Sequence, residues 1–225
     1  MTTIAPKTSH PRDLAVLGGT GNLGLGLAYR WARAGHRVII GSRAADKAEA
    51  AARELTPRVL GASVRALDNS AAAQAAEIVA VSVPFAAQQG TLAAIKDAVQ
   101  GKIVIDTTVA LKPPKVGMVQ MPPEGSAGMI AQSLLGPGVR VVSAFQNVAA
   151  AVLDSDHEID CDVLVTGNDA EACAIVTALA ADAGMRAFHA GPIENSVAVE
   201  GITSILITLN RRYKVGHAGI RITGL

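Results

Sequence analysis

The chain has 225 residues, of which 50% are apolar and 17% are charged, and its formal net charge is +1. This length allows one full α/β domain with a small addition and excludes two large domains. A net charge so close to zero argues against an electrostatic partner, so we expect neither nucleic acid nor a membrane surface to bind.

The first residues and the cysteines favour a cytoplasmic protein. Residues 1–13, MTTIAPKTSHPRD, hold no apolar run of the kind that exports or anchors a chain, and we interpret them as an N-terminal extension. The later apolar segments are interrupted by polar residues or proline, so none predicts a membrane span. Cys161 and Cys173 lack metal-type spacing, which predicts reduced thiols and no metal site.

Short apolar runs alternate with alanine-rich segments as far as residue 150. Runs rich in valine and isoleucine predict strands buried on both faces, as in a parallel sheet covered by helices, over residues 14–19, 37–42, 63–68, 77–84, 102–108 and 140–145. The intervening patterns predict helices over residues 25–35, 44–55 and 88–99. The proline-rich segment 110–138 is interpreted as a long crossover with one helix.

Beyond residue 150 the pattern changes to a strand over 162–167, a helix over 169–184, a strand-like run over 186–192 and a long apolar helix over 195–213. Together these patterns predict an α/β fold with a Rossmann-type, doubly wound parallel sheet. We assign residues 14–150 to a nucleotide-binding Rossmann domain and residues 151–225 to a small C-terminal α/β lobe.

A glycine-rich motif follows the first predicted strand and opens the first predicted helix. Gly19, Gly21 and Gly24 satisfy G-x-G-x-x-G, which in this context is typical of a dinucleotide site. Glycines let the backbone approach a pyrophosphate, and the N–H groups of Thr20, Asn22 and Leu23 would point at the anion. An ordinary tight turn between strand and helix is the alternative.

The end of the second predicted strand carries a hydroxyl and a cation where an NAD site has an acid. Ser42 and Arg43 stand about twenty residues after the glycine motif, and Lys47 falls on the same face of the following helix. An acid would repel a 2′-phosphate, whereas these three side chains attract one. The pattern therefore predicts NADP, unless Arg43 and Lys47 are simply solvated surface cations.

The chain offers no obvious general acid–base pair. Tyr29 and Tyr213 are followed four residues later by Arg33 and His217, so the Tyr-x-x-x-Lys pair of short-chain dehydrogenases is missing. We assign no catalytic residue, because a hydride moved between two carriers needs little proton transfer from the protein.

Several stretches together resemble the F420-dependent NADP reductases: the GGTGNLG loop, GSR with its following lysine, AVSVPF, RVVSAFQNVAA, AGPIENSVAVEGIT and the closing GHAGIRITGL. The resemblance covers nearly all of the chain after residue 13. It implies reversible hydride transfer between C5 of the reduced deazaflavin, coenzyme F420, and C4 of the nicotinamide of NADP. It also implies a homodimer.

The resemblance further implies roles for individual residues. The NADP pyrophosphate would lie on Gly19, Thr20, Gly21, Asn22 and Leu23, its 2′-phosphate on Ser42, Arg43 and Lys47, and the rest of the nucleotide along Val83, Pro84, Phe85 and Gln89. The stacked rings would lie over Gln146, Asn147, Val148 and Ala150, with Ala218 bordering the deazaflavin and the C-terminal lobe closing the cleft. The chain departs from the family at Gln146, where histidine is common, so this side chain cannot become cationic.

Alternatives to this interpretation remain. Phe85 could be plain core packing, and Ala218 could lie in a simple terminal strand. The chain could be an NADPH-dependent reductase of another acceptor, such as a flavin, a ferric chelate or an imine. It could also be a non-catalytic module that senses NADP.

Overall fold

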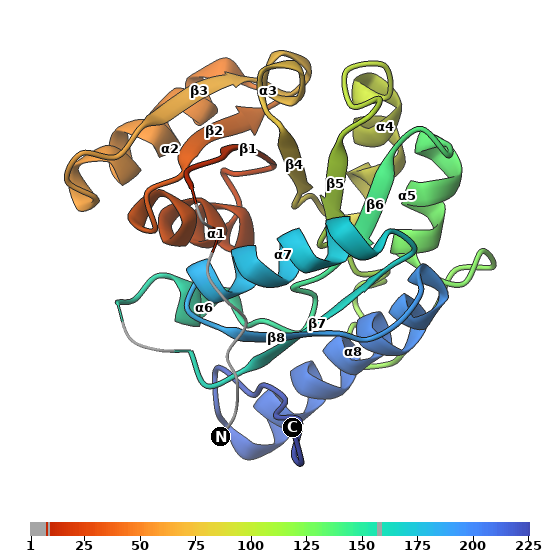
Figure 1. Cartoon of the computed structure of the whole chain (residues 1–225). Helices are drawn as coiled ribbons and strands as arrows, with labels where there is room; N and C mark the ends of the chain where they lie inside the picture. The colour runs from red at the N-terminus through yellow and green to blue at the C-terminus, as the bar shows by residue number, and fades with distance from the viewer. Residues whose placement is uncertain (1–7, 9, 157–158) are drawn as a thin grey trace.

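The computed structural model describes residues 8, 10–156 and 159–225, and within them eight strands form one sheet in the order β3-β2-β1-β4-β5-β6-β7-β8 (Figure 1). The strands are β1 (Asp13–Leu17), β2 (Arg37–Ser42), β3 (Val64–Asp68), β4 (Ile78–Val81), β5 (Ile103–Asp106), β6 (Arg140–Ser143), β7 (Asp162–Gly167) and β8 (Arg186–His189). All neighbours from β3 through β6 pair in parallel, as do β7 and β8. The reversal of strand order between β1 and β4 creates a topological switch point.

Helices cover both faces of this sheet. They are α1 (Asn22–Arg33), α2 (Ala45–Leu55), α3 (Asn69–Ala75), α4 (Phe85–Ile95), α5 (Ala127–Leu135), α6 (Ala150–Leu153), α7 (Ala170–Asp182) and α8 (Ser196–Tyr213), with short 3₁₀ turns η1 (Thr56–Arg58) and η2 (Ile193–Asn195). Leu14 and Val16 pack in one core cluster with α1, α2 and α7, whereas Ala15 and Leu17 pack in a second one with α3, α4 and α5. The expected doubly wound α/β fold is confirmed.

Strand and helix ends differ from the sequence prediction where the chain leaves the sheet to form loops. The first predicted strand stops at Leu17 rather than at residue 19, and the fourth stops at Val81 rather than at residue 84. Helix α3 was not predicted; the Asp68 carboxylate caps it by accepting from the N–H groups of Ser70 and Ala71, each at 2.9 Å. The single helix expected in the crossover is α5.

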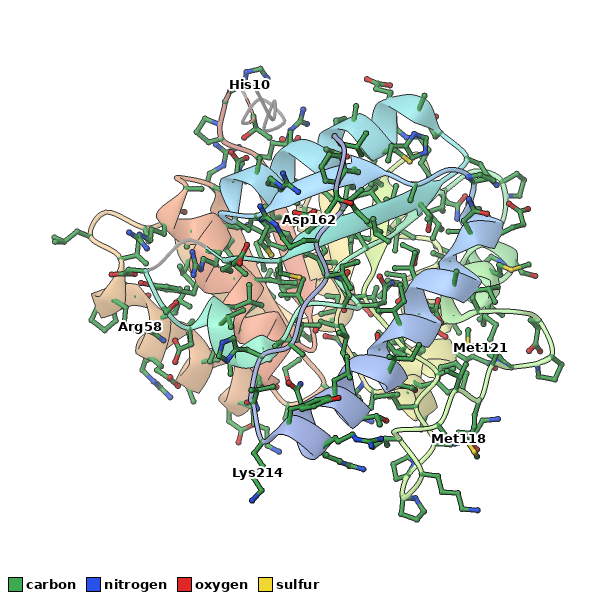
Figure 2. All side chains as sticks on the ribbon, turned by 90° about the horizontal axis from the view of Figure 1, so that it is seen from below. His10, Arg58, Met118, Met121, Asp162 and Lys214 are labelled. Atoms are coloured by element: carbon green, nitrogen blue, oxygen red, sulfur yellow. The ribbon has the colours of Figure 1, made fainter. Side chains whose placement is uncertain are left out.

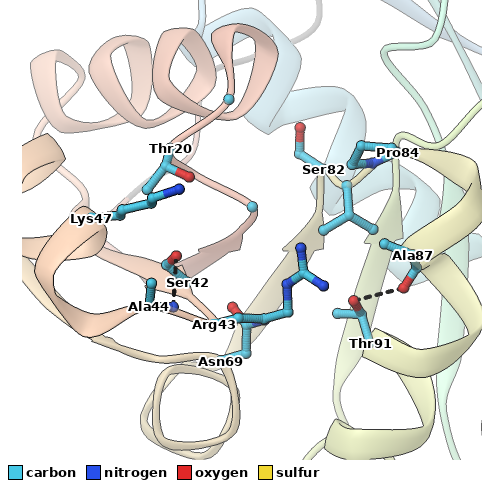
Figure 3. A pocket seen from close by; sticks show the side chains of 13 residues that line it. Thr20, Ser42, Arg43, Ala44, Lys47, Asn69, Ser82, Pro84, Ala87 and Thr91 are labelled. Carbon is cyan, nitrogen blue, oxygen red and sulfur yellow. Dashed lines mark hydrogen bonds between the residues drawn. The ribbon is translucent and has the colours of Figure 1, made fainter.

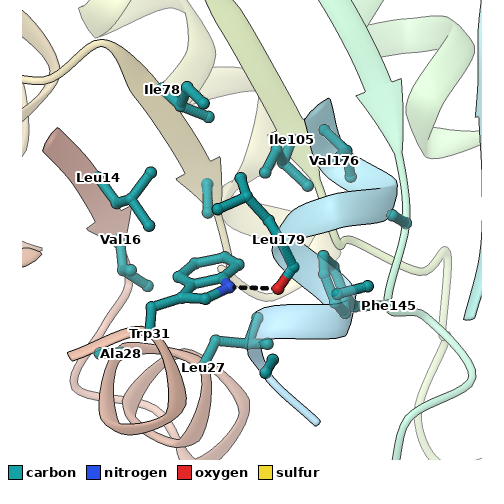
Figure 4. Packing of buried hydrophobic residues seen from close by; sticks show 14 of the residues in the cluster. Leu14, Val16, Leu27, Ala28, Trp31, Ile78, Ile105, Phe145, Val176 and Leu179 are labelled. Carbon is teal, nitrogen blue, oxygen red and sulfur yellow. Dashed lines mark hydrogen bonds between the residues drawn. The ribbon is translucent and has the colours of Figure 1, made fainter. Parts of the chain in front are cut away.

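The C-terminal segment shares the sheet and the core of the first part. β7 joins β6 antiparallel through the pairs Val142–Gly167 and Ser143–Thr166. Trp31 of α1 donates its indole N–H to the Leu179 carbonyl of α7 at 2.9 Å and packs edge-on against Phe145, with ring centroids 5.9 Å apart (Figure 4). The boundary at residue 150 stays a prediction. The expected extension over residues 1–13 falls mostly on residues 1–7 and 9, which lie outside the described residues.

Among the residues that the structure describes, no helix combines the length and the apolar character needed to cross a bilayer.

Candidate functional site

The turn from β1 into α1 is tightly packed and has its backbone N–H groups at the helix start. Gly18 has a φ of +74°, and a side-chain carbon there would lie 2.3 Å from the carbonyl oxygen of Ser82. A side-chain carbon at Gly24 would lie 2.8 Å from the Gly18 carbonyl oxygen. No side chain caps α1, and its first turn holds no acid. This helix start can therefore accept an anion.

A cavity of about 500 Å³ opens beside this turn, at the carboxyl ends of β1, β2 and β4 (Figure 3). The structure brings together in its wall these residues singled out from the sequence: Thr20, Gly21, Ser42, Arg43, Lys47, Val83 and Pro84. A ligand at this place lies where open α/β sheets bind nucleotides, at the switch point of the strand order.

Polar and cationic groups set the electrostatics of the cavity. Arg43, which follows β2, and Lys47 of α2 are exposed and direct their charged ends toward the cavity (Figure 3). Ser42 is 8% exposed, and its hydroxyl accepts from the Ala44 N–H at 3.2 Å. No aspartate or glutamate belongs to the described lining of this cavity. The wall therefore favours an anion with several oxygens.

A second cavity of about 520 Å³ adjoins the first and continues it between α3 and α4. Both cavities share Ser42, Arg43, Asn69, Ala87 and Thr91, so we treat them as one nucleotide groove. The Asn69 side-chain oxygen is buried and has no hydrogen-bond partner among the described residues. Asn69, Ala87 and Thr91 were missed from the sequence, because only the fold brings the start of α3 next to α4.

The loop after β6 holds two buried amides whose donors bind inside the protein. The Gln146 side-chain nitrogen donates to the Asp106 carbonyl oxygen at 2.9 Å and to the Ser143 hydroxyl at 2.7 Å. The Asn147 side-chain nitrogen donates to the Asp162 carbonyl oxygen at 2.7 Å. Their side-chain oxygens are buried without a partner among the described residues, so these amides offer acceptors.

Backbone strain accompanies this loop. Phe145 is fully buried and has a φ of +72°, a conformation that is costly for a bulky side chain. The Thr203 hydroxyl of α8 donates to the Gln146 carbonyl oxygen at 2.9 Å. Strain of this kind persists only where surrounding contacts fix the backbone, and Trp31 and Thr203 supply such contacts.

The C-terminal tail packs beside the same loop, outside any helix or strand. The Ala218 N–H donates to the Asn210 side-chain oxygen of α8 at 2.8 Å. Further on, the Asp162 N–H donates to the Ile220 carbonyl oxygen at 2.8 Å, and the Ile222 N–H donates to the Asp162 carboxylate at 2.6 Å. Asp162 thus joins the tail to the loop of Asn147.

Two further carboxylates, Glu200 and Asp106, are buried, and neither was singled out from the sequence. Glu200 of α8 accepts from the N–H groups of Ala127 and Gly128 at the start of α5, at 2.9 and 3.0 Å, and burial raises its pKa to about 8. Asp106 accepts from the Gln88 side chain and from the Thr108 N–H, and burial raises its pKa as well. Both carboxylates are fully buried and bind protein groups.

Comparison with known proteins identifies the family. A family model described as "NADP oxidoreductase coenzyme F420-dependent" matches residues 13–110. Curated F420-dependent NADP reductases from Methanocaldococcus jannaschii and Methanothermobacter thermautotrophicus are each 42% identical over 221 residues, covering 94% of this chain and 98% and 95% of theirs. The chain belongs to the F420-dependent NADP reductase family.

Structural similarity to this reductase family agrees with the sequence match. A crystal structure from Arthrobacter sp. FB24, provisionally described as an F420-dependent NADP-reductase, superposes with a TM-score of 0.80 at 26% identity, covering 94% of this chain and 99% of that one. The resemblance stated from the sequence motifs is thus confirmed.

The structure does not bring all the predicted reductase residues into the groove. Phe85 is half-buried at the start of α4 and Gln89 is exposed on α4, and neither lines the groove. Asn22 and Ala150 line a separate cavity of about 440 Å³ between α1, α2 and α6. The other predicted residues outside the groove wall are Gly19, Leu23, Gln146, Asn147, Val148 and Ala218.

Proposed function

We propose that this protein catalyses reversible hydride transfer between reduced coenzyme F420 and NADP. The observation that carries the proposal is the nucleotide groove, in which Ser42, Arg43 and Lys47 replace the acid of an NAD site, in a chain 42% identical to F420-dependent NADP reductases. Family membership supports both coenzymes.

The residues present fit NADP. Gly18 and Gly24 let backbone segments pack closely and so fix the turn, Gly21 lines the groove where the backbone would approach a pyrophosphate, and the uncapped start of α1 supplies N–H donors. Arg43 and Lys47 would hold the 2′-phosphate, with Ser42 beside them. The unpartnered Asn69 oxygen would accept a hydrogen bond from the adenosine end.

The proposed mechanism is positional. NADP supplies a nicotinamide whose C4 takes or gives the hydride when it is bound. The buried oxygens of Gln146 and Asn147 would accept from amide or ring N–H groups and orient the two rings face to face. Holding the two rings in this orientation, with water kept out, would provide most of the acceleration. We assign no catalytic acid or base, and the proton released from the reduced deazaflavin would leave to solvent.

We further propose that residues 151–225 form a lobe that closes the deazaflavin site over the Rossmann domain of residues 14–150. The tail contact between Ala218 and Asn210 and the contact between Thr203 and Gln146 support this arrangement. We also propose a cytoplasmic homodimer. The two cysteines are free and buried, as expected in a reducing compartment, and α8 carries the exposed apolar side chains Ile205 and Leu209.

Purified protein mixed with NADPH tests the function directly. Oxidised F420 should consume NADPH, followed as nicotinamide absorbance, whereas a flavin, a ferric chelate and an imine should not. Turnover with one of those three acceptors and none with F420 would overturn the proposal. Tight NADP binding without turnover on any acceptor would instead identify an NADP-sensing module.

A further inference from the structure

Five exposed cations lie on two segments, distant in the sequence, that are bonded to each other near the carboxyl end of α8. We call them the α8 cation cluster: Lys112, Lys115, Arg211, Arg212 and Lys214. Figure 2 shows Lys214 on one side of the last turns of α8 and Met118, which follows the two lysines in the sequence, on the other side.

Specific contacts hold the loop against this end of the helix. The Thr208 hydroxyl donates to the Gly117 carbonyl oxygen at 2.9 Å, and the Ser204 hydroxyl donates to the Met118 carbonyl oxygen at 3.4 Å. A side-chain carbon at Gly117 would lie 3.9 Å from the Arg211 Nη1 atom. Turns at Lys112 and Lys115, closed by N–H to carbonyl bonds of 3.1 and 3.0 Å, keep both lysines on this loop.

The cluster lacks acidic partners. Throughout residues 8, 10–156 and 159–225, no ion pair includes any of its five side chains. The partial negative charge at a helix carboxyl end accounts for Arg211 and Arg212. It does not account for Lys112 and Lys115, which come from the loop that Ser204 and Thr208 bind to α8 and which add like charge on that loop.

The cluster lies next to the residues that border the deazaflavin in the proposed function. Along α8, Thr203 contacts the Gln146 loop, Asn210 contacts Ala218, and Arg211 and Arg212 follow at once. Thr203 and Arg211 are eight positions apart, which corresponds to about 12 Å along the helix. A flexible side chain attached to a ring at the Gln146 loop can cover that distance.

Resting on the proposed function, we propose that the α8 cation cluster binds the anionic side chain of coenzyme F420, that is, its phosphodiester and its glutamate carboxylates. Guanidinium groups pair with phosphate and carboxylate oxygens in a bidentate manner, and lysines add point charges. Each exposed ion pair is weak and screened by salt, so only a ligand with several anionic groups gains much from this surface.

The test compares two deazaflavins, F420 with its full side chain and the same ring bearing only the ribitol chain. In Arg211→Gln/Arg212→Gln, we expect the KM for F420 to rise about tenfold, with the KM for the ribitol compound, the KM for NADPH and kcat unchanged. Lys112→Gln/Lys115→Gln changes the other segment and should act in the same direction. Added salt should raise the KM for F420 in the wild type more than in either variant.

Lys96→Gln, an exposed lysine after α4, is the matched control and should change none of these constants. An equal rise of KM for both deazaflavins, or no rise for F420 in either double variant, would overturn the cluster as a side-chain site and leave the proposed function intact. A wild-type enzyme that turns over neither deazaflavin would overturn the proposed function, and this site with it.

Discussion

Asp162 and Arg186 form a bidentate ion pair at the junction of β7, β8 and the C-terminal tail. Arg186 donates from Nε at 2.8 Å and from Nη2 at 2.6 Å to a carboxylate that is fully buried. Asp162 also binds the tail, because its N–H donates to the Ile220 carbonyl oxygen and its carboxylate accepts from the Ile222 N–H. Its carbonyl oxygen accepts from the side chain of Asn147 in the loop. Asp162 therefore connects two of the segments proposed to border the deazaflavin, the tail through its carboxylate and backbone N–H and the loop through its backbone carbonyl.

Asp162→Asn should lower the free energy of unfolding by about 3 kcal/mol, because it leaves the Arg186 charge without its partner. The released tail should also raise the KM for F420 more than the KM for NADPH. Urea denaturation and steady-state kinetics measure the two effects. Asp160→Asn, whose exposed carboxylate contacts Arg221, is the control and should change neither.

The same pair predicts a loss of stability in acid. Burial alone would raise the pKa of Asp162, but the hydrogen bonds from Arg186 and Ile222 outweigh burial and hold that pKa below its ordinary value. The ionised carboxylate thus contributes stability at any pH above the ordinary carboxyl range, and this contribution is lost as the pH falls through the lowered pKa. Asp162→Asn should lack this acid transition, and persistence of the transition in the variant would assign it elsewhere.

Glu200 should make the stability of the fold decrease as the pH rises, which is opposite to the effect of Asp162. Burial raises its pKa to about 8, and nearby Asp106 adds to the rise, so the folded state holds a proton that the unfolded state has already lost above the ordinary value of 4.5. Stability should therefore decrease from about pH 5 to about pH 8, by about 1.4 kcal/mol per pH unit at most.

Glu200→Gln should flatten this slope, as seen in unfolding measured across that pH range. Glu194→Gln makes the same chemical change at an exposed position and should keep the slope. An unchanged slope in the Glu200 variant would show that the two N–H groups of α5 keep the carboxylate ionised.

Arg43→Asp should make the corner of the groove that we propose to bind the 2′-phosphate repel that phosphate. We expect the kcat/KM for NADPH to fall about a hundredfold, with NADH activity kept or improved, because the new carboxylate accepts from a ribose hydroxyl. Arg53→Asp on α2, outside the groove, reverses the same charge and should leave the preference unchanged. Equal losses with both nucleotides would contradict the assignment.

Gly18→Ala should be strongly destabilising, by about 3 kcal/mol or more, because φ is +74° and the new carbon would meet a backbone oxygen. Gly90→Ala provides the contrast: it lies inside α4 with no atom within 4 Å of the added carbon, and should stabilise the fold by about 0.5–1 kcal/mol. Urea unfolding midpoints of the two variants measure this difference in stability. Equal midpoints would contradict the prediction and would mean that the turn at Gly18 rearranges to accept the side chain.

The nucleotide half of the fold could be predicted because its signals are local. Valine and isoleucine runs predicted strands β1 to β6. The glycine spacing with Arg43 and Lys47 predicted a nucleotide site, and the wall of the groove contains Gly21, Arg43 and Lys47. Asn69 could not be predicted as a groove residue from local signals, because the alanine-rich stretch that follows it does not mark the start of α3. The antiparallel pairing of β7 with β6 could not be predicted either, because it involves only two residue pairs and no local sequence pattern marks it.

The buried acids were missed for a related physical reason. Glu200 has backbone N–H groups of Ala127 and Gly128 as partners, and these come from a helix more than seventy residues earlier. No pairing of side-chain types in the sequence marks such a contact. The roles proposed for Gln146, Asn147 and Ala218 rest on family resemblance, and the structure adds their hydrogen-bond partners.

Trp31, the single tryptophan of the chain, also has a practical value. Its indole touches α7 on one side and Phe145, next to the strained loop, on the other. Its emission is therefore an intrinsic optical reporter for that junction. A titration with NADP or with the deazaflavin, in which tryptophan is excited selectively, should detect rearrangement of the loop as a change in tryptophan fluorescence, without an added label.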